Sequence, residues 1–266
     1  MTMTEYPGKG DPQRSLELLW APPKQPSRGP KPGLDLVRIV RAAVELADAE
    51  GLAALSMRRV AEGLGVGAMS LYTYVPGKAE LLDLMLDLVL GEIFSGACGV
   101  PADPAADWRT RLDTRARQDW ALYQRHPWLL QIAVARAILG PNETALYELS
   151  LAAVAGIGLS GREMVAAVSL VSGYVRGAAQ GVLEAALAAR QTGVSDEQWW
   201  AAREAIFEQY FDPALYPTMV AVEQAGGFAP PGDRDDYHLQ RAVDDFEFGL
   251  QRILDGVEAF IQRVKR

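Results

Sequence analysis

Residues 56–74 restrict the possible fold more than any other part of the sequence. Ser56 suits the N-cap of a helix that runs to about Gly63, because its hydroxyl can accept a hydrogen bond from a free backbone N–H of the first turn. Residues 64–66 then suit a tight turn, and a short helix is predicted over about residues 68–74. The segment therefore predicts two helices joined by a very short connection.

Small residues stand where these two helices would cross. Ala61 allows a close approach, and Gly65, four residues later, supplies the turn. The apolar seam between the helices would be formed by Val60, Leu64, Val66 and Leu71. This pattern indicates a helix-turn-helix. The same spacing also occurs in small helical bundles that do not bind DNA, so the spacing alone leaves both interpretations open.

Apolar residues on either side predict two further helices. From residue 34 onward they recur at spacings of three and four, and Gly51 suits the position just past a helix end. Pro76 suits the first turn of a fourth helix, which is apolar on two adjoining faces. We interpret residues 34–78 as a helix-turn-helix domain and residues 79–99 as a connector helix that touches two bodies.

The rest of the chain reads as helices after a proline-containing loop at residues 100–104. Helices are predicted over about residues 107–125, 127–139, 143–157, 162–190, 196–211, 213–224 and 237–264. No convincing alternating pattern competes with them. The predicted fold is all-α, with an N-terminal three-helix helix-turn-helix domain and a larger helical domain over residues 100–266.

Residues 34–88 resemble the N-terminal domain of the TetR family of regulators. The segments LSMRRVAEGLGV, LYTYV and GK-x-x-L-L occur in the family's order and spacing within IVRAAVELADAEGLAALSMRRVAEGLGVGAMSLYTYVPGKAELLDLM. The resemblance implies a DNA-binding protein whose second domain binds a ligand and mediates dimerisation. It makes double-stranded operator DNA, a small-molecule effector and a second copy of the chain the expected partners.

The resemblance also implies roles for individual residues. Arg58 is similar to a position that can reach a base edge, and an arginine there can bond guanine in two places. Tyr72 and Lys78 resemble residues that contact phosphates. The remaining positions expected at the DNA are Met69, Ser70, Thr73 and Tyr74. For Tyr74 the alternative is packing against the first helix. Because the recognition helix carries no Arg, Asn or Gln, we expect its direct reading of bases to be modest.

Residues 1–33 are rich in Pro, Gly, Lys and Arg, which predicts a flexible basic arm, with a possible helical turn at residues 15–20. The formal net charge of the whole chain is −8, yet basic residues gather just before the first helix. We hypothesise that Arg28 and Lys31 enter the minor groove or line its phosphates. The alternative is a solubilising tail that never orders.

Two helices of the second domain carry stripes suited to helix packing. Glycines recur every four residues in the long helix, and the last helix has apolar residues at alternating steps of four and three. The resemblance implies a four-helix dimer interface, for which the candidate residues are Gly173, Gly177, Gly181, Phe246, Leu250, Ile253 and Val257. The alternative is that both stripes serve only the core of one copy.

A ligand pocket is expected among aromatic and polar residues near His126. The candidates are Trp120, Tyr123, Trp128, Gln131, Tyr174 and Arg176. Aromatic residues at helical spacing usually belong to a core, and this alternative remains open. Arg176 lies in a very apolar helix, so we expect it to pair with an acid or to anchor an anionic ligand.

The sequence gives little support for catalysis, because its two histidines and one cysteine form no cluster with metal-ligand spacing. We expect no enzyme activity, cofactor, metal or membrane span, and a cytoplasmic location fits the single cysteine. The predicted function is a ligand-responsive repressor that binds a palindromic operator as a homodimer and leaves it when a small molecule binds. The alternatives are a regulator that activates or needs no ligand and, more remotely, a helical enzyme with an auxiliary DNA-binding domain.

Overall fold

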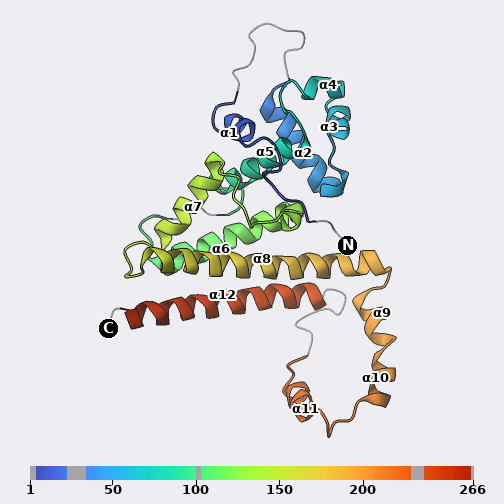
Figure 1. The fold of residues 1–266 in the computed structure, drawn as a ribbon. Coiled ribbons are helices and arrows are strands. Elements are labelled where there is room, and N and C mark those ends of the chain that lie inside the picture. The colour runs from blue at the N-terminus through green and yellow to red at the C-terminus, as the bar shows by residue number, and fades with distance from the viewer. Residues whose placement is uncertain (1–3, 23–33, 100–102, 229–236, 265–266) are drawn as a thin grey trace. The chain divides into compact units, whose positions relative to one another are not determined.

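The structure is a computed structural model that describes residues 4–22, 34–99, 103–228 and 237–264 (Figure 1). Among these residues every regular element is a helix, and the one extended pairing is an isolated bridge between Glu5 and Ile132. The all-helical fold predicted from the sequence is therefore confirmed. No helix in the described ranges is both long and apolar enough to cross a membrane.

The N-terminal elements are α1 (Pro12–Trp20), α2 (Leu36–Glu50), η1 (Leu52–Ala54), α3 (Met57–Gly63), α4 (Ala68–Leu71), α5 (Lys78–Leu90) and η2 (Gly91–Ile93). They are followed by α6 (Trp108–Arg125), η3 (Pro127–Gln131), α7 (Pro141–Ala153), α8 (Gly161–Thr192), α9 (Asp196–Ala201), α10 (Glu204–Tyr210), α11 (Pro217–Gln224) and α12 (Tyr237–Val264). The chain divides into two compact units, one formed by the described residues of Met1–Arg176 and Leu254–Arg266, the other by those of Gly177–Ile253.

Short polar side chains cap the N-termini of several helices. The carboxylate of Asp35 accepts a hydrogen bond from the backbone N of Arg38 at 2.8 Å and so caps α2. Ser56 caps α3 in the same way, and Asp107 caps α6. Gly51 ends α2 with a φ of 81°, a conformation that glycine adopts without steric cost.

One apolar core joins the helix-turn-helix region to the segment after α6. Its most buried members include Ile39 of α2, Leu71 of α4 and Met85 of α5, each with 0% of its surface exposed. Trp128 and Ile132 belong to the same core although they lie more than forty positions later in the chain. The core therefore extends across the boundary that the sequence suggests between domains.

The structure differs from the sequence prediction in the recognition helix and just after it. The helix ends at Leu71 rather than at Tyr74, and Tyr72 to Tyr74 form a turn in which the backbone N of Tyr74 donates to the carbonyl of Leu71. Pro76 lies outside α5, because Gly77 is its N-cap. Since a residue before proline disfavours helical backbone, Val75 cannot continue α4.

Two predicted helices of the second half are also interrupted. Only residues 127–131 of the predicted 127–139 helix are helical, and Ile132 is extended because its neighbours pair with Glu5. The predicted 196–211 helix is split into α9 and α10. The guanidinium of Arg203 donates to the carbonyl of Trp199 at 3.3 Å and stacks over its ring. This hydrogen bond gives a partner to one of the backbone carbonyls at the end of α9.

The N-terminal residues depart furthest from the prediction of a flexible arm. Residues 4–22 are folded: α1 begins at Pro12, is capped by Asp11 and contacts α5. Leu19 of α1 is buried with 8% of its surface exposed. A nine-residue helix is marginal in water by itself, so α1 owes its stability to this packing on α5.

Candidate nucleic-acid interface

The turn between α3 and α4 is closed by backbone contacts. The backbone N of Val66 donates to the carbonyl of Ala61 at 3.0 Å, and Gly65 adopts a φ of 66°. The expected seam is present below this turn: Val60 and Ala61 are each 1% exposed and Leu71 is 0% exposed, while Leu64 and Val66 are half-buried. Burial of one side of α3 and α4 leaves their opposite side facing solvent.

That solvent side carries most of the residues predicted to contact DNA. Met69 is 78% exposed and Tyr72 46% exposed, and Ser70 and Thr73 are exposed as well. Tyr74 is half-buried and packs against the core to which α2 contributes, which favours the alternative interpretation. The exposed surface of α4 and the following turn thus offers a thioether, hydroxyls and one phenol.

Arg58 lies on the exposed side of α3. Its side chain is 85% exposed, and its Nε donates to Oε1 of Glu62, one turn later, at 2.8 Å. An exposed ion pair of this kind contributes little to stability, so the guanidinium can leave Glu62 for another acceptor at small cost. Arg59 differs, because its side chain is bonded to Glu50 of α2 and thereby links α3 to α2.

Lys78 begins α5, whose first turn has no side-chain cap because Gly77 precedes it. The free backbone N–H groups and the positive end of the helix dipole favour an anion at this place. Lys78 itself is paired with Glu5, with 3.4 Å between Nζ and Oε1. The contact with Glu5 could not be inferred from the sequence, because 73 positions separate the two residues. Arg28 and Lys31, predicted to extend this surface, lie outside the described residues.

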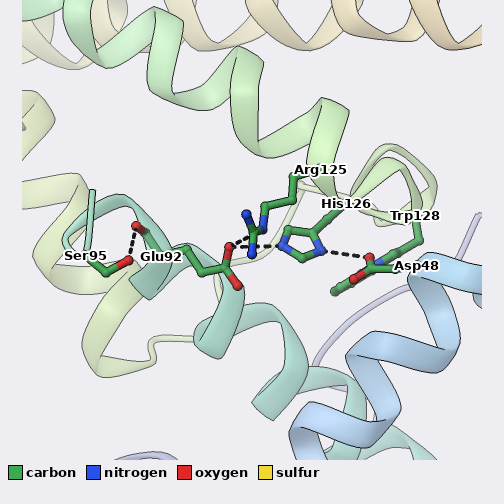
Figure 2. Close-up of polar contacts among 6 residues, drawn as sticks. All are labelled: Asp48, Glu92, Ser95, Arg125, His126 and Trp128. Atoms are coloured by element: carbon green, nitrogen blue, oxygen red, sulfur yellow. Dashed lines mark hydrogen bonds and ion pairs between the residues drawn. The ribbon is translucent and has the colours of Figure 1, made fainter. Parts of the chain in front are cut away.

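A polar cluster around the buried side chain of His126 joins the helix-turn-helix region to the segment after α6 (Figure 2). Nδ1 of His126 lies 2.7 Å from Oδ1 of Asp48 on α2, and its Nε2 lies 3.2 Å from Oε2 of Glu92. The indole N–H of Trp128 donates to the same Asp48 oxygen at 2.8 Å, and Arg125 pairs with Glu92 at 2.8 Å. Asp48 thus binds α2 to the corner between α6 and η3.

The residues predicted to line a ligand pocket do not all lie in one place. Trp128 is 1% exposed and bonded to Asp48, so it belongs to the core beneath the helix-turn-helix. Tyr123 and Arg176 do lie together, with 5.8 Å between the guanidinium carbon and the ring centroid. Trp120, Gln131 and Tyr174 are half-buried on α6, η3 and α8.

The sequence leads us to expect an acid or an anionic ligand beside Arg176, but the structure gives it backbone partners. Its guanidinium donates to the carbonyls of Leu129, Leu130 and Ile132 at 3.2, 2.8 and 2.6 Å. The helix ends after residue 131, which leaves the carbonyls of Leu130 and Ile132 without a following helical N–H, whereas the carbonyl of Leu129 also accepts from the backbone N of Ile132 at 3.1 Å. The arginine therefore satisfies backbone acceptors and holds the 129–132 segment against α8.

Further buried polar groups lie along α6. Arg115 pairs with Asp119 at 2.7 Å and donates to the hydroxyl of Ser150 at 3.3 Å, and burial raises the pKa of Asp119. A small cavity of about 80 Å³ lies beside them, lined by Pro104, Arg111, Arg115, Leu149, Ala152 and Ala153. The Nε of Arg111 is buried and has no hydrogen-bond partner among the described residues. None of these groups was singled out from the sequence.

The predicted dimer residues fall into two sets. Gly173, Gly177 and Gly181 are exposed, and an added Cβ at each would meet no atom within 4 Å. Phe246, Leu250 and Val257 are buried within a single chain, at 1%, 0% and 6% exposure, and Ile253 is half-buried. Burial of the α12 residues favours the alternative that this stripe forms the core of one copy. The glycine line of α8 remains open to an approaching helix.

Comparison with known proteins places this arrangement in a family. Residues 39–85 match the family described as bacterial regulatory proteins, tetR family, and residues 100–261 match the tetracyclin repressor-like C-terminal domain. The chain is 46% identical over 263 residues to the HTH-type transcriptional repressor DrrR1 of Streptomyces coeruleorubidus, across 97% of this chain and 90% of that repressor.

Solved structures show the same fold. Apo ActR from Streptomyces coelicolor matches with a TM-score of 0.65 and 29% identity over 88% of this chain and 99% of ActR. ActR in complex with actinorhodin matches with a TM-score of 0.65 over 87% of this chain. The matched families describe regulatory proteins, which confirms the prediction of a DNA-binding regulator rather than an enzyme. Both the helix-turn-helix and the helical C-terminal region therefore show that this chain belongs to the TetR family of bacterial transcriptional regulators.

Proposed function

We propose that the protein is a repressor that binds a palindromic operator as a homodimer and leaves the DNA when a small molecule binds its C-terminal region. The observation that carries the DNA-binding part is the exposed surface of α4 and the following turn, with Met69 and Tyr72 in solvent above a seam whose Val60 and Leu71 are buried. Arg58 on α3 and Lys78 at the uncapped start of α5 flank this surface. We place the protein in the cytoplasm, where it would meet chromosomal DNA.

The glycine line of α8 supports the homodimer. Three glycines on one side of a helix allow a second helix to approach closely, and their neighbourhood is open in the single chain. A twofold dimer presents two recognition surfaces to successive major grooves, which is the arrangement that a palindromic site requires.

Release by a ligand is supported by the ActR complexes, in which a relative of this fold binds actinorhodin or (S)-DNPA. In this chain, we propose that the effector binds near Tyr123, Arg176 and the half-buried residues Trp120, Gln131 and Tyr174. Movement of the 129–132 segment would then reach α2 through Trp128 and Asp48. A ligand with higher affinity for one arrangement of these contacts shifts the protein toward that arrangement.

Repression is tested with a DNA duplex selected from a random library by the full-length protein. This selected duplex is placed between a constitutive promoter and a reporter, and reporter output is compared with and without the protein. We expect a lower output, which a scrambled duplex of the same composition does not show. An increased output would replace repression by activation, and the absence of any selected duplex would overturn DNA binding.

Ligand release is tested separately with actinorhodin, the molecule in the ActR complex. The affinity for the selected duplex is measured across a series of actinorhodin concentrations, together with the melting temperature of the protein without DNA. We expect the melting temperature to rise and the DNA affinity to fall, because both report binding to the DNA-free arrangement. If actinorhodin changes neither quantity, the inference from the ActR complex to this chain is wrong.

A further inference from the structure

Residues 4–22, which we call the N-terminal clasp, contact two parts of the protein at once. The backbone N of Glu5 donates to the carbonyl of Gln131 at 2.9 Å, and the backbone N of Ala133 donates to the carbonyl of Glu5 at 2.8 Å. At the other end of the clasp, the indole N–H of Trp20 donates to the carbonyl of Leu139 at 2.8 Å. The clasp is therefore anchored twice on the connection between η3 and α7.

Between these anchors the clasp covers buried carboxylates of α5. Asp83 is 1% exposed and accepts hydrogen bonds from the backbone N of Gly8 at 2.9 Å and the hydroxyl of Ser15 at 3.0 Å. Glu80 is 7% exposed and accepts from the backbone N of Asp11 at 3.2 Å. A buried carboxylate without such donors would lower the stability of the folded protein. The hydrogen bonds from the clasp therefore stabilise the buried carboxylates of α5.

The two backbone hydrogen bonds of Glu5 fix where its side chain lies. From that position its carboxylate reaches the side chain of Lys78, with 3.4 Å between Oε1 and Nζ, and it lies 3.9 Å from Nζ of Lys9. Lys78 is the residue that we propose to bind a DNA phosphate. The carboxylate of Glu5 therefore neutralises, in the DNA-free protein, the charge that a phosphate would use.

The segment that holds Glu5 is itself held by α8. Arg176 donates to the carbonyl of Ile132 at 2.6 Å, and the backbone groups on either side of Ile132 are those that bond Glu5. A continuous series of direct contacts thus runs from Arg176 through residues 131–133 and Glu5 to Lys78. All of these residues belong to one compact unit of the chain.

We propose that the clasp is an autoinhibitory element in which Glu5 competes with operator phosphate for Lys78. The proposal rests on the proposed function, because it takes Lys78 as a phosphate-binding residue. Lys78 must leave Glu5 before it can bind a phosphate. The clasp therefore lowers operator affinity, and a stronger Glu5–Lys78 pair lowers it further. A change in residues 129–133 alters the position of Glu5 and, through it, the affinity for DNA.

The test compares the affinities of full-length variants for the selected duplex at a fixed salt concentration. Glu5→Gln keeps the size and the backbone contacts of Glu5 but removes its charge. The matched control is Glu17→Gln, an exposed acid of α1 that bonds Gln13 and gives the same change in net charge. A common thermal-melting check establishes that all variants fold.

We expect Glu5→Gln to bind the duplex about two- to fivefold more tightly than the wild type, the range for release of one exposed ion pair. Glu17→Gln gives at most the small gain of a general charge effect. In a Lys78→Gln background, Glu5→Gln brings no further gain beyond that of Glu17→Gln, because the competing lysine is gone. The first two results together with this lost effect support the clasp as a competitor.

Three other outcomes overturn the proposal for different reasons. If Lys78→Gln weakens DNA binding while Glu5→Gln behaves like Glu17→Gln, the clasp does not compete, and the proposed function stands. If Lys78→Gln leaves the affinity unchanged, the phosphate role of Lys78 is wrong and the competition fails with it. If no variant or wild-type protein selects a duplex, DNA binding itself is refuted.

Discussion

At the residue scale, the pairs Arg58–Glu62 and Arg117–Asp113 have the same local form. Each arginine donates through Nε to an acid four positions away, at 2.8 and 2.7 Å, on the surface of a helix. Only Arg58 lies beside the exposed surface of α4. Comparison of the two arginines therefore separates a role at the DNA from the loss of a surface charge.

We predict that Arg58→Ala weakens binding to the selected duplex by about 1–3 kcal/mol and relaxes the base preference at one position of each half-site, because an arginine at a base edge can make two hydrogen bonds. Arg117→Ala, the control, leaves the base preference unchanged. Selection from the random library repeated with each variant measures both effects. A loss of affinity that is equal for all sequences would assign Arg58 to a phosphate instead of a base.

Asp83 gives a pH prediction at the same scale. Burial raises the pKa of its carboxyl, so the folded protein binds this proton more tightly than the unfolded chain does. The ionised carboxylate therefore lowers stability at neutral pH, and this cost disappears as the pH falls through the folded pKa toward the unfolded value of about 3.9.

Asp83→Asn removes this titration and keeps an acceptor for Gly8. We predict that the free energy of unfolding of the variant, relative to the wild type, is more favourable at pH 7 than at pH 4.5. Urea denaturation at the two pH values measures the difference, and groups that titrate in both proteins largely cancel. A relative stability that is constant or rises toward low pH would be inconsistent with the raised pKa.

At the scale of elements, local signals and long-range contacts differ in what they predict. Ser56 and Gly51 mark the ends of α3 and α2 because a cap acts within one turn, and both ends follow from the sequence. The sequence predicts a helix over residues 132–139, because the contacts that hold Ile132 in an extended conformation come from Glu5 and Arg176, which are distant in sequence. The clasp and the Asp48–His126 contact could not be predicted from the sequence for the same reason, because the residues in contact are distant in sequence.

The exposed residues of α4 were predicted from family spacing, and the structure places them together on one surface. Tyr74 is the exception, since a half-buried ring on that turn packs against the core. The ligand pocket was harder to predict. Trp128 has helical spacing suited to a pocket, but a buried indole N–H needs an acceptor, and Asp48 supplies it from α2.

The turn between α3 and α4 allows a sharp test of its backbone. Gly65 has a φ of 66°, whereas Gly67 has a φ of −71°, and an added Cβ meets no atom within 4 Å at either position. We predict that Gly65→Ala lowers the free energy of unfolding by about 1 kcal/mol, because a side chain disfavours the left-handed conformation. Gly67→Ala is close to neutral. If urea denaturation shows that Gly65→Ala and Gly67→Ala change the free energy of unfolding equally, the left-handed conformation of Gly65 does not explain the effect.

The glycine line of α8 gives the second prediction at this scale. Gly177→Leu places a large side chain where a second copy is expected, and we predict a shift from dimer to monomer in analytical ultracentrifugation. Ala186→Leu is the control, because Ala186 is also exposed and nine residues place it on the opposite side of the helix. A dimer that survives Gly177→Leu but is lost in Ala186→Leu would locate the interface on the other side.

At the scale of the whole molecule, the DNA binding and the ligand regulation that we propose would use one set of contacts. The core under α3 and α4 includes Trp128, and α5 is covered by the clasp that Ile132 and its neighbours hold. The helix-turn-helix region is therefore fastened to the C-terminal region at two places, through Asp48 and through Glu5. A change at residues 126–133 would alter both contacts, which is the route by which we propose that a small molecule acts on the DNA-binding surface.

We propose that two copies of this chain read a twofold-symmetric site through α4. The most direct measurement is a hydroxyl-radical footprint of the wild-type protein on the selected duplex, with the number of bound chains determined on the same complex. We predict two protected patches related by a twofold axis, with centres about one helical turn or a multiple of it apart, and an even number of chains per duplex. A single unsymmetrical patch with one bound chain would contradict the claim.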